Sequence, residues 1–360
     1  MTRLERLRNQ MAQEGVDLVA LAPGAHMAWL LDLRPHADER PLLACITADG
    51  IGLLIPALEA ESARKQTDLP FFEWSDDDGP DTALGHLLQD LGATDARSIV
   101  LDECMRADHA GLVQDRLPGA KRIFTETTVG ALRMRKEPGE YALMKENALQ
   151  ADHAMEAAWA AMAAGQTELE VAEVVRDSFA SQGAAALFAI VGAGANGAMP
   201  HHHTGTTVLE AGQQVVMDIG AAYKGYSSDI TRMASLGPPS EEYLKVHAVV
   251  DAAVEAGLQA TRPGVPAHVV DDAARRVITE AGYGEYFVHR TGHGIGSEGH
   301  EPPYISASSK VVLDENMTFS IEPGIYMPGK FGLRLEEIVI LRADGPEIMS
   351  ELPRDLRVVG

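Results

Sequence analysis

Four acidic residues in the second half of the chain interrupt segments that are otherwise apolar, and a histidine lies between them in a glycine-rich stretch. In chain order these residues are Asp218, Asp229, His293, Glu322 and Glu336. A carboxylate in apolar surroundings is desolvated at a cost of several kcal/mol unless a positive charge neutralises it. The only basic residues in the same runs are Lys224, Arg232 and Arg334, too few to neutralise four acids by ion pairing. One or two divalent metal ions are therefore the simplest partners.

Each of these acids has an ordinary structural explanation when it is taken alone. An aspartate close to a glycine is typical of a turn, and a glutamate before a proline often marks the end of a strand. Taken together, the four carboxylates and the imidazole form an oxygen-rich set of donors with one nitrogen. Such a set suits Mn²⁺ or Co²⁺ better than the thiolate-rich sets of structural zinc sites do. We therefore expect a metal centre.

The motifs around these residues resemble those of the M24-type metallopeptidase family, which contains aminopeptidase P, prolidase, methionine aminopeptidase and the metal-free creatinases. The matching motifs run from D-I-G at Asp218 through S-D-I-T-R, T-G-H-G-I-G, S-E-G-H-E-P-P and I-E-P-G-I-Y to R-L-E-E at Arg334. With P-H-H-H at Pro200 and the helix that begins near Lys136, the resemblance covers roughly two thirds of the chain. Glu337 stands where the family commonly has aspartate, outside the expected ligand set.

The resemblance implies a site for two divalent metal ions, for which we expect Mn²⁺, with Co²⁺ or Zn²⁺ as alternatives. The implied metal ligands are Asp218, Asp229, His293, Glu322 and Glu336. Glu322 is also implied to take the proton of the attacking water and return it to the leaving amine. Arg334 is counted with the substrate-binding residues, and its simplest role is to orient the ligand carboxylates.

Three further histidines match family positions that face the substrate. His201 and His300 are implied to stabilise the oxyanion, and His289 is implied to line the pocket. A solvated loop explains the neighbouring His202 and His203 equally well.

The choice of substrate rests on one position. Creatinases have replaced the metal ligands that are intact here, and a methionine aminopeptidase would hardly need the first 130 residues. Prolidases resemble one another in an arginine shortly after H-E-x-P, thought to bind a dipeptide's carboxylate, and Tyr304 occupies that substrate-binding position here. We therefore predict an Xaa-Pro aminopeptidase (aminopeptidase P), which acts on peptides with proline in the second position.

Two alternatives stay open. The enzyme is an Xaa-Pro dipeptidase (prolidase) if another arginine reaches the same point from a loop. It is a non-catalytic pita-bread binding module if the fold is kept without chemistry, although such a module would be expected to have lost ligands. Metal analysis, together with hydrolysis of a tripeptide with proline in second position, distinguishes the non-catalytic module from the two peptidases.

The amino-acid composition indicates which binding partners the protein lacks and in which cellular compartment it works. The formal net charge of −23 argues against nucleic acid and anionic membranes, because both repel an acidic surface. Two cysteines are too few for a disulfide framework, which indicates a reducing compartment. Neither an apolar leader nor an uncharged run of eighteen apolar residues occurs. We expect a cytoplasmic homodimer.

The elements that must position the site follow from length and periodicity. The length of 360 residues predicts two domains. The first, over 1–130, is expected to be α/β with structural and oligomer-contact roles, and the resemblance implies that it is a creatinase-like N-terminal domain. The second, over 131–360, is the catalytic domain. In the first, helices are expected at 2–14 and 81–91, and strands at 16–21, 41–46, 51–55 and 98–101.

The catalytic domain is predicted to open with a long helix from Pro138 to about Ala164. A weak repeat follows at an offset of 99 residues, in which Gly165, Val171, Arg176 and Gly183 recur as Gly264, Val270, Arg275 and Gly282. Each copy precedes a hairpin that carries two acids. Two such hairpins related by pseudo-two-fold symmetry would bring four carboxylates to one point. This is the α+β pita-bread fold that the family resemblance implies.

Overall fold

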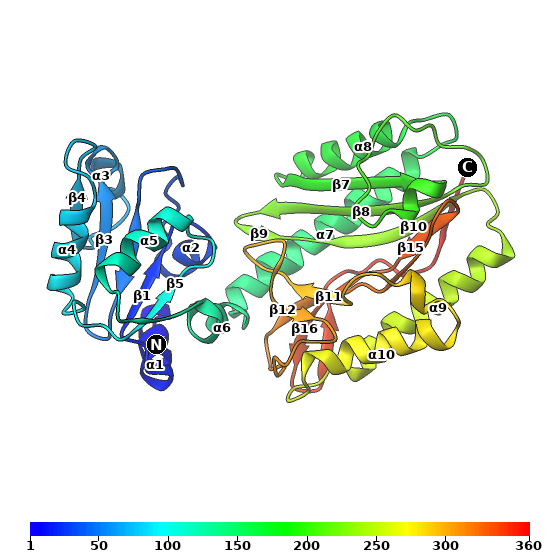
Figure 1. Ribbon diagram of the computed structural model, residues 1–360. Coiled ribbons are helices and arrows are strands. Elements are labelled where there is room, and N and C mark those ends of the chain that lie inside the picture. The colour runs from blue at the N-terminus through cyan, green and yellow to red at the C-terminus, as the bar shows by residue number, and fades with distance from the viewer. The chain divides into compact units, whose positions relative to one another are not determined.

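The computed structural model describes residues 1–360, which form two compact units, Met1–Arg133 and Met134–Gly360 (Figure 1). Each unit has its own sheets and its own hydrophobic clusters. No helix in either unit combines the length and the apolar character needed to cross a bilayer.

The first unit is a six-stranded mixed sheet with helices on both faces. Its helices are α1 (Arg3–Glu14), α2 (Ala25–Leu31), α3 (Ala57–Ala63), α4 (Asp81–Asp90), α5 (Ala107–Arg116) and α6 (Val129–Arg133). Its strands are β1 (Leu18–Leu21), β2 (Leu43–Ile46), β3 (Ile51–Pro56), β4 (Phe71–Trp74), β5 (Ser98–Leu101) and β6 (Lys121–Ile123), in the order β4-β3-β2-β1-β5-β6. Alternate residues of β1 enter two separate cores, one with α4 and α5 and one with α1 and α2.

The local predictions for this unit are confirmed within a few residues at element ends. The helix at the start has Thr2 as its N-cap in a capping box with Glu5, and Leu7 and Met11 face the core. The predicted hairpin pairs β2 with β3 antiparallel, with Ile46 opposite Ile51 across the turn. Spacing of apolar residues was sufficient here because these elements are set by local periodicity.

The second unit contains two helix pairs, each associated with a curved sheet whose strands pair antiparallel, except for one parallel edge pair in the first sheet (Figure 1). The helices are α7 (Pro138–Ala161), α8 (Glu168–Ser181), α9 (Glu241–Ala260) and α10 (Ala267–Glu280). The first sheet has the order β18-β10-β8-β7, and β9 pairs with β8; the strands are β7 (Ala185–Ala193), β8 (Gln214–Tyr223), β9 (Tyr226–Ser227), β10 (Ile230–Leu236) and β18 (Arg357–Val359).

The second sheet has the order β12-β11-β13-β16-β17. Its strands are β11 (Gly292–Gly294), β12 (Glu301–Ile305), β13 (Thr318–Ile321), β16 (Glu337–Arg342) and β17 (Gly345–Ile348). A separate hairpin, β14 (Gly324–Met327) with β15 (Phe331–Arg334), follows β13. Three short 3₁₀ turns complete the chain, at Thr125–Thr127, Gly194–Ala198 and Gly284–Tyr286.

The predicted repeat corresponds to this two-fold arrangement. Gly165 and Gly264 precede the second helix of each pair, and Gly183 and Gly282 follow it; all four have positive φ, which glycine adopts without strain. Thr167 caps α8 in the predicted capping box with Glu170. The expected fold class, an α/β unit followed by an α+β pita-bread unit with pseudo-two-fold symmetry, is confirmed.

Candidate metal centre and active site

Two of the predicted ligands come from neighbouring strands of the first sheet. Asp218 lies in the middle of β8, and Asp229 directly precedes β10. These strands pair antiparallel, with Thr231 of β10 opposite Asp218, so Asp229 lies two residues from that pair. The residues on either side of Asp218, Met217 and Ile219, are fully buried in the core between this sheet and helices α7 and α8. The sheet therefore holds both carboxylates at fixed positions.

The other three predicted ligands come from the second sheet. His293 is the central residue of β11, Glu322 follows β13, and Glu336 lies between β15 and β16. Glycine is required on both sides of His293, because a Cβ at Gly292 would lie 1.9 Å from the Ser320 carbonyl oxygen and one at Gly294 would lie 2.3 Å from that of Pro302. The G-H-G motif thus allows the neighbouring strands to approach the histidine closely.

Both sheets face one cavity of about 690 Å³. Among the predicted site residues, those that line it are His201, Asp218, Asp229, His289, His293, His300, Glu322 and Arg334. Glu336 is 1% exposed and lies behind this wall, with a carboxylate oxygen within 4.8 Å of ligand atoms of Asp218 and Asp229 and, in a second group, of His293 and Glu322. The structure therefore brings all five predicted ligands together.

The polar atoms of this cluster fit divalent metal ions. Asp218 Oδ1 and Glu336 Oε1 are buried and have no hydrogen-bond partner in the protein. A buried carboxylate oxygen without a partner is costly, and a cation between the ligand atoms would remove that cost. Of the basic residues near these runs, Arg334 alone reaches the carboxylates, because Arg232 pairs with Glu337 and Lys224 lies beside Glu146.

Protonation of the ligand acids reflects the same excess of negative charge. Burial and the charges of neighbouring carboxylates raise the pKa of Asp229 and of Glu336 well above the ordinary range. Burial also acts to raise the pKa of Glu322, but its hydrogen bond to His293 and the nearby positive charges outweigh it and lower that pKa to about 2. Glu322 therefore stays ionised more readily than Asp229 or Glu336.

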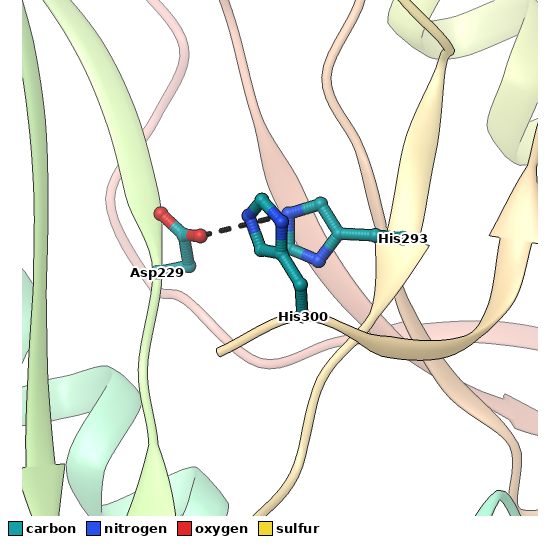
Figure 2. Close-up of side chains that lie close together, drawn as sticks. All are labelled: Asp229, His293 and His300. Carbon is teal, nitrogen blue, oxygen red and sulfur yellow. Dashed lines mark ion pairs between the residues drawn. The ribbon is translucent and has the colours of Figure 1, made fainter. Parts of the chain in front are cut away.

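His293 presents its metal-binding nitrogen to the carboxylates. Its Nδ1 lies 3.0 Å from the Gly294 carbonyl oxygen, to which it donates. Nε2 lies 3.2 Å from Glu322 Oε1 and 3.8 Å from Asp229 Oδ2. It donates to Glu322 when the ring is protonated, and it carries the lone pair that a metal ion needs when the ring is neutral. Figure 2 shows Asp229 directed at the ring of His293, with the ring of His300 beside it. A lone pair facing two carboxylates is the arrangement expected around a cation.

Arg334 connects the ligand acids to one another. Its guanidinium forms an ion pair with Asp218 and donates to Thr231 Oγ1 at 3.0 Å and to the Tyr326 hydroxyl at 2.7 Å. The Thr231 hydroxyl donates in turn to Glu336 Oε2 at 2.9 Å. Arg334 is thus fully occupied by protein groups and orients two of the acids.

The predicted histidines have different surroundings. His289 uses both ring nitrogens internally: Nδ1 donates to the Arg290 carbonyl at 2.7 Å, and Nε2 lies 2.8 Å from the Tyr326 hydroxyl. His289 therefore lines the cavity with both ring nitrogens in contact with protein groups. Because Arg334 donates to the Tyr326 oxygen, the hydroxyl hydrogen is directed at His289.

His300 retains a free ring nitrogen. Its ring lies 3.8 Å from that of His293, centre to centre, and its Nδ1 accepts a hydrogen bond of 3.2 Å from Arg290. Burial, together with the charges of His293 and Arg290, lowers the pKa of His300 to about 4, so the ring is neutral near pH 7. With Nδ1 accepting, Nε2 carries the hydrogen and can donate. His201 is exposed and lines the same cavity.

His202 is held by a buried acid rather than by solvent. Its Nε2 lies 2.8 Å from Glu168 Oε2, and the same carboxylate accepts hydrogen bonds from the Ala193 and Gly205 backbone and from Asn196. Glu168 lies in the first turn of α8 and is fully buried. It fixes the loop that carries His201.

Sequence reasoning missed Glu168, Asp271, Tyr326 and Arg290. Asp271 of α10 is also fully buried, and it accepts hydrogen bonds from the backbone and hydroxyl of Thr291, two residues before His293. Arg290 stands over the ring of Tyr304, 4.4 Å from its centre. The inference of a missing anchor at Tyr304 did not consider Arg290, which lies fourteen positions earlier and reaches that ring from the loop before β11. An arginine directly after His289 was the available signal.

Comparisons with known proteins identify both units. The model of the Creatinase/Prolidase N-terminal domain matches residues 3–135, and the model of Metallopeptidase family M24 matches residues 142–343. All five predicted metal ligands fall within the second match.

The similarity to known proteins extends over nearly the whole chain. It is 37% identical over 355 residues to a probable dipeptidase PepE of Mycobacterium tuberculosis, covering 97% of this chain and 93% of the relative. It is 31% identical over 356 residues to an Xaa-Pro dipeptidase of Pyrococcus furiosus, covering 98% of this chain and 99% of the relative.

Solved structures of similar peptidases superpose on nearly the whole chain. Dipeptidase PepE from Mycobacterium ulcerans superposes with a TM-score of 0.94 at 35% identity, covering 99% of this chain and 97% of the other. An X-Pro aminopeptidase from Thermotoga maritima superposes with a TM-score of 0.85 at 33% identity, covering 100% of both chains.

Proposed function

Because the chain belongs to metallopeptidase family M24, we propose that it is a metal-dependent Xaa-Pro dipeptidase, a prolidase, which hydrolyses the bond between the two residues of a dipeptide ending in proline. The names of the relatives favour this alternative over the aminopeptidase P activity that the residue at position 304 had led us to expect. The observation that carries the proposal is the convergence of five ligand-type residues, two with unpartnered buried oxygens, on one cavity.

The ligand set supports a two-metal site. Asp218, Asp229, His293, Glu322 and Glu336 would hold the ions, with Mn²⁺ as our first expectation because four of the five donors are carboxylates. When bound, two such ions activate a water for attack and polarise the carbonyl of the scissile bond. A cytoplasmic homodimer and a structural role for residues 1–130 stay predictions of the sequence.

The protein's own groups supply proton transfer and charge stabilisation. Glu322 accepts the proton of the attacking water and delivers it to the prolyl nitrogen, which must be protonated to leave. Its Oε1 is held by the Ser320 hydroxyl at 3.0 Å, which fixes the direction of transfer. His300 donates from Nε2 to the oxygen that gains negative charge, and His201 lines the same cavity.

The test is a comparison of initial rates with Ala-Pro and Ala-Pro-Ala, using protein stripped of metal by chelation and refilled with Mn²⁺. A dipeptidase should cleave Ala-Pro with kcat/KM at least about tenfold higher than Ala-Pro-Ala, a difference of roughly 1.4 kcal/mol. Stripped protein should be inactive on both. Preference for the tripeptide would identify an aminopeptidase P, and full activity in protein free of metal would exclude both assignments.

A further inference from the structure

Arg290 is a cavity-lining cation whose charge the protein leaves uncompensated. Its guanidinium forms one hydrogen bond within the protein, to His300 Nδ1 at 3.2 Å, and no carboxylate lies within 4.0 Å of it. A guanidinium has five N–H donors, so most of them face the cavity without a protein partner. Arg334, the other arginine on the cavity wall, is by contrast occupied by Asp218, Thr231 and Tyr326.

Tyr304 fixes the direction of this cation. The guanidinium carbon lies 4.4 Å from the centre of the Tyr304 ring, within the range of a cation–π contact. Arg290 lies in the loop before β11 and Tyr304 lies in strand β12, and the Tyr304 ring is 39% exposed. Contact with the ring face and with His300 restricts a long side chain that would otherwise sample many rotamers. Arg290 is thus a preorganised and unpaired positive charge beside the predicted metal ligands.

The contact between Arg290 and His300 places the guanidinium where the terminal carboxylate of a dipeptide would lie. In a dipeptide, the terminal carboxylate carbon is three bonds from the scissile carbonyl carbon, a separation of at most about 4.3 Å. A group that binds the carboxylate must therefore adjoin the group that contacts the scissile carbonyl. Arg290 is hydrogen-bonded to His300, the residue with a free Nε2 donor, and meets this condition.

On the basis of the proposed peptidase function, we infer that Arg290, supported by the ring of Tyr304, binds the terminal carboxylate of the dipeptide and selects dipeptides over longer peptides. Arginine suits this role because its planar fork can bind both carboxylate oxygens at once. A tripeptide places a neutral peptide bond at the same point, and the cation then remains without a partner. Selection thus acts through the charge of the substrate, independently of the metal.

The experiment compares Ala-Pro with Ala-Pro-amide, which differ in the charge of one terminal group. In the Mn²⁺-loaded enzyme, Arg290→Gln should lower kcat/KM for Ala-Pro by roughly 10- to 100-fold, mainly through KM, because hydrogen bonds to a charged group are lost. The same substitution should lower kcat/KM for the amide only through the lost contact with His300, so that the ratio of kcat/KM for Ala-Pro to kcat/KM for the amide falls at least about tenfold. Arg290→Lys should fall between wild type and Arg290→Gln, and Tyr304→Phe, which keeps the ring, should retain the preference.

A role of Arg290 in orienting His300 alone predicts a different result. Both substrates would then lose activity by the same factor, and the ratio of the two kcat/KM values would stay at the wild-type value; that outcome overturns the inference. Arg276→Gln is the matched control, since Arg276 is an exposed arginine of α10 that does not line the cavity. It should leave both rates unchanged.

Failure of the proposed dipeptidase function can be distinguished from failure of the inference about Arg290. If the wild-type enzyme cleaves Ala-Pro no better than Ala-Pro-Ala, the dipeptidase assignment fails whatever Arg290 does. Calorimetric binding of proline and prolinamide then tests Arg290 without turnover. Tighter binding of proline that Arg290→Gln abolishes supports the carboxylate contact, and equal binding of the two ligands by the wild-type protein rejects it. Circular dichroism of each variant shows whether it is folded.

Discussion

Glu168 is the residue whose replacement tests most directly how the His201 loop is held. It is fully buried at the start of α8, and its two oxygens accept four hydrogen bonds. Oε1 accepts from the Ala193 N–H at 2.9 Å and from Asn196 Nδ2 at 2.8 Å, while His202 Nε2 at 2.8 Å and the Gly205 N–H at 3.2 Å contact Oε2. The carboxylate thus joins both ends of the loop to the helix.

Glu168→Gln keeps the shape of the side chain and replaces one acceptor oxygen by an NH₂ group. The amide oxygen can still serve two donors, but the NH₂ group then faces the Gly205 N–H, which loses its partner. An unsatisfied buried N–H costs about 1–3 kcal/mol, and loss of the negative charge weakens the remaining bonds and the favourable interaction with the helix N-terminus. We expect the free energy of unfolding to fall by about 2–4 kcal/mol.

Glu170→Gln is the matched control on the same helix. Glu170 also accepts hydrogen bonds, from Thr167, but it is exposed and belongs to the capping box alone, so its replacement should cost under about 1 kcal/mol. Urea unfolding can be followed by the fluorescence of Trp159, the single tryptophan of the second unit, with Trp29 and Trp74 replaced by phenylalanine. The slope with urea must stay constant for the midpoints to be compared.

The pH dependence provides a second measurement on the same residue. Burial acts to raise the pKa of Glu168, but its hydrogen bonds from Ala193, Asn196 and His202 outweigh it and lower that pKa. A lowered folded-state pKa means that the stabilisation is present above the pKa of the unfolded chain and is lost as pH falls. The difference between wild type and Glu168→Gln should therefore shrink in acid. A loss of under about 1 kcal/mol at neutral pH would refute the reasoning.

Three further outcomes are expected. Glu322→Gln should reduce kcat on a proline dipeptide by far more than tenfold, and a loss below tenfold, about 1.4 kcal/mol, would exclude proton transfer by this residue. In metal-free protein the raised pKa values of Asp229 and Glu336 mean that the folded state binds protons more tightly than the unfolded chain, so the melting temperature should fall as the pH rises above the ordinary carboxyl pKa of about 4. Saturating Mn²⁺ should raise the melting temperature and flatten this dependence on pH. An identical melting curve with and without Mn²⁺ would contradict this. Tyr326→Phe should cost about 1–3 kcal/mol of stability because the Arg334 donor loses its buried acceptor, and a variant as stable as wild type in urea would show that the hydroxyl is dispensable.

Local elements and the ligand set could be read from the sequence. The capping boxes at Thr2 and Thr167, the hairpin at residues 41–55 and the strand at 98–101 depend on residues close together in the chain, so short-range spacing was sufficient. The residue types of the metal ligands could also be predicted, because a carboxylate in an apolar segment requires a compensating charge wherever that segment lies in the fold. The motif order then indicated the family and, through it, the pita-bread fold.

The division of roles among the polar residues required the tertiary structure. His289 matched a pocket position in the sequence, yet its ring nitrogens are used by Arg290 and Tyr326, the latter 37 residues away. His202 was compatible with a solvated loop, and a buried acid 34 residues earlier holds it instead. Which donor meets which acceptor depends on how separate strands and helices pack, and no spacing along the chain encodes that distance.

Substrate selection also depends on a contact between separate segments that the sequence alone does not predict. The sequence determined that position 304 is a tyrosine, and from that residue alone a missing carboxylate anchor was a reasonable inference. Only the fold decided that the guanidinium of Arg290 stands over this ring, because the loop before β11 and strand β12 are brought together by pairing between β11 and β12. A charge acts through space with a strength set by distance and burial, so its effect is decided by the packed structure and not by its place in the chain.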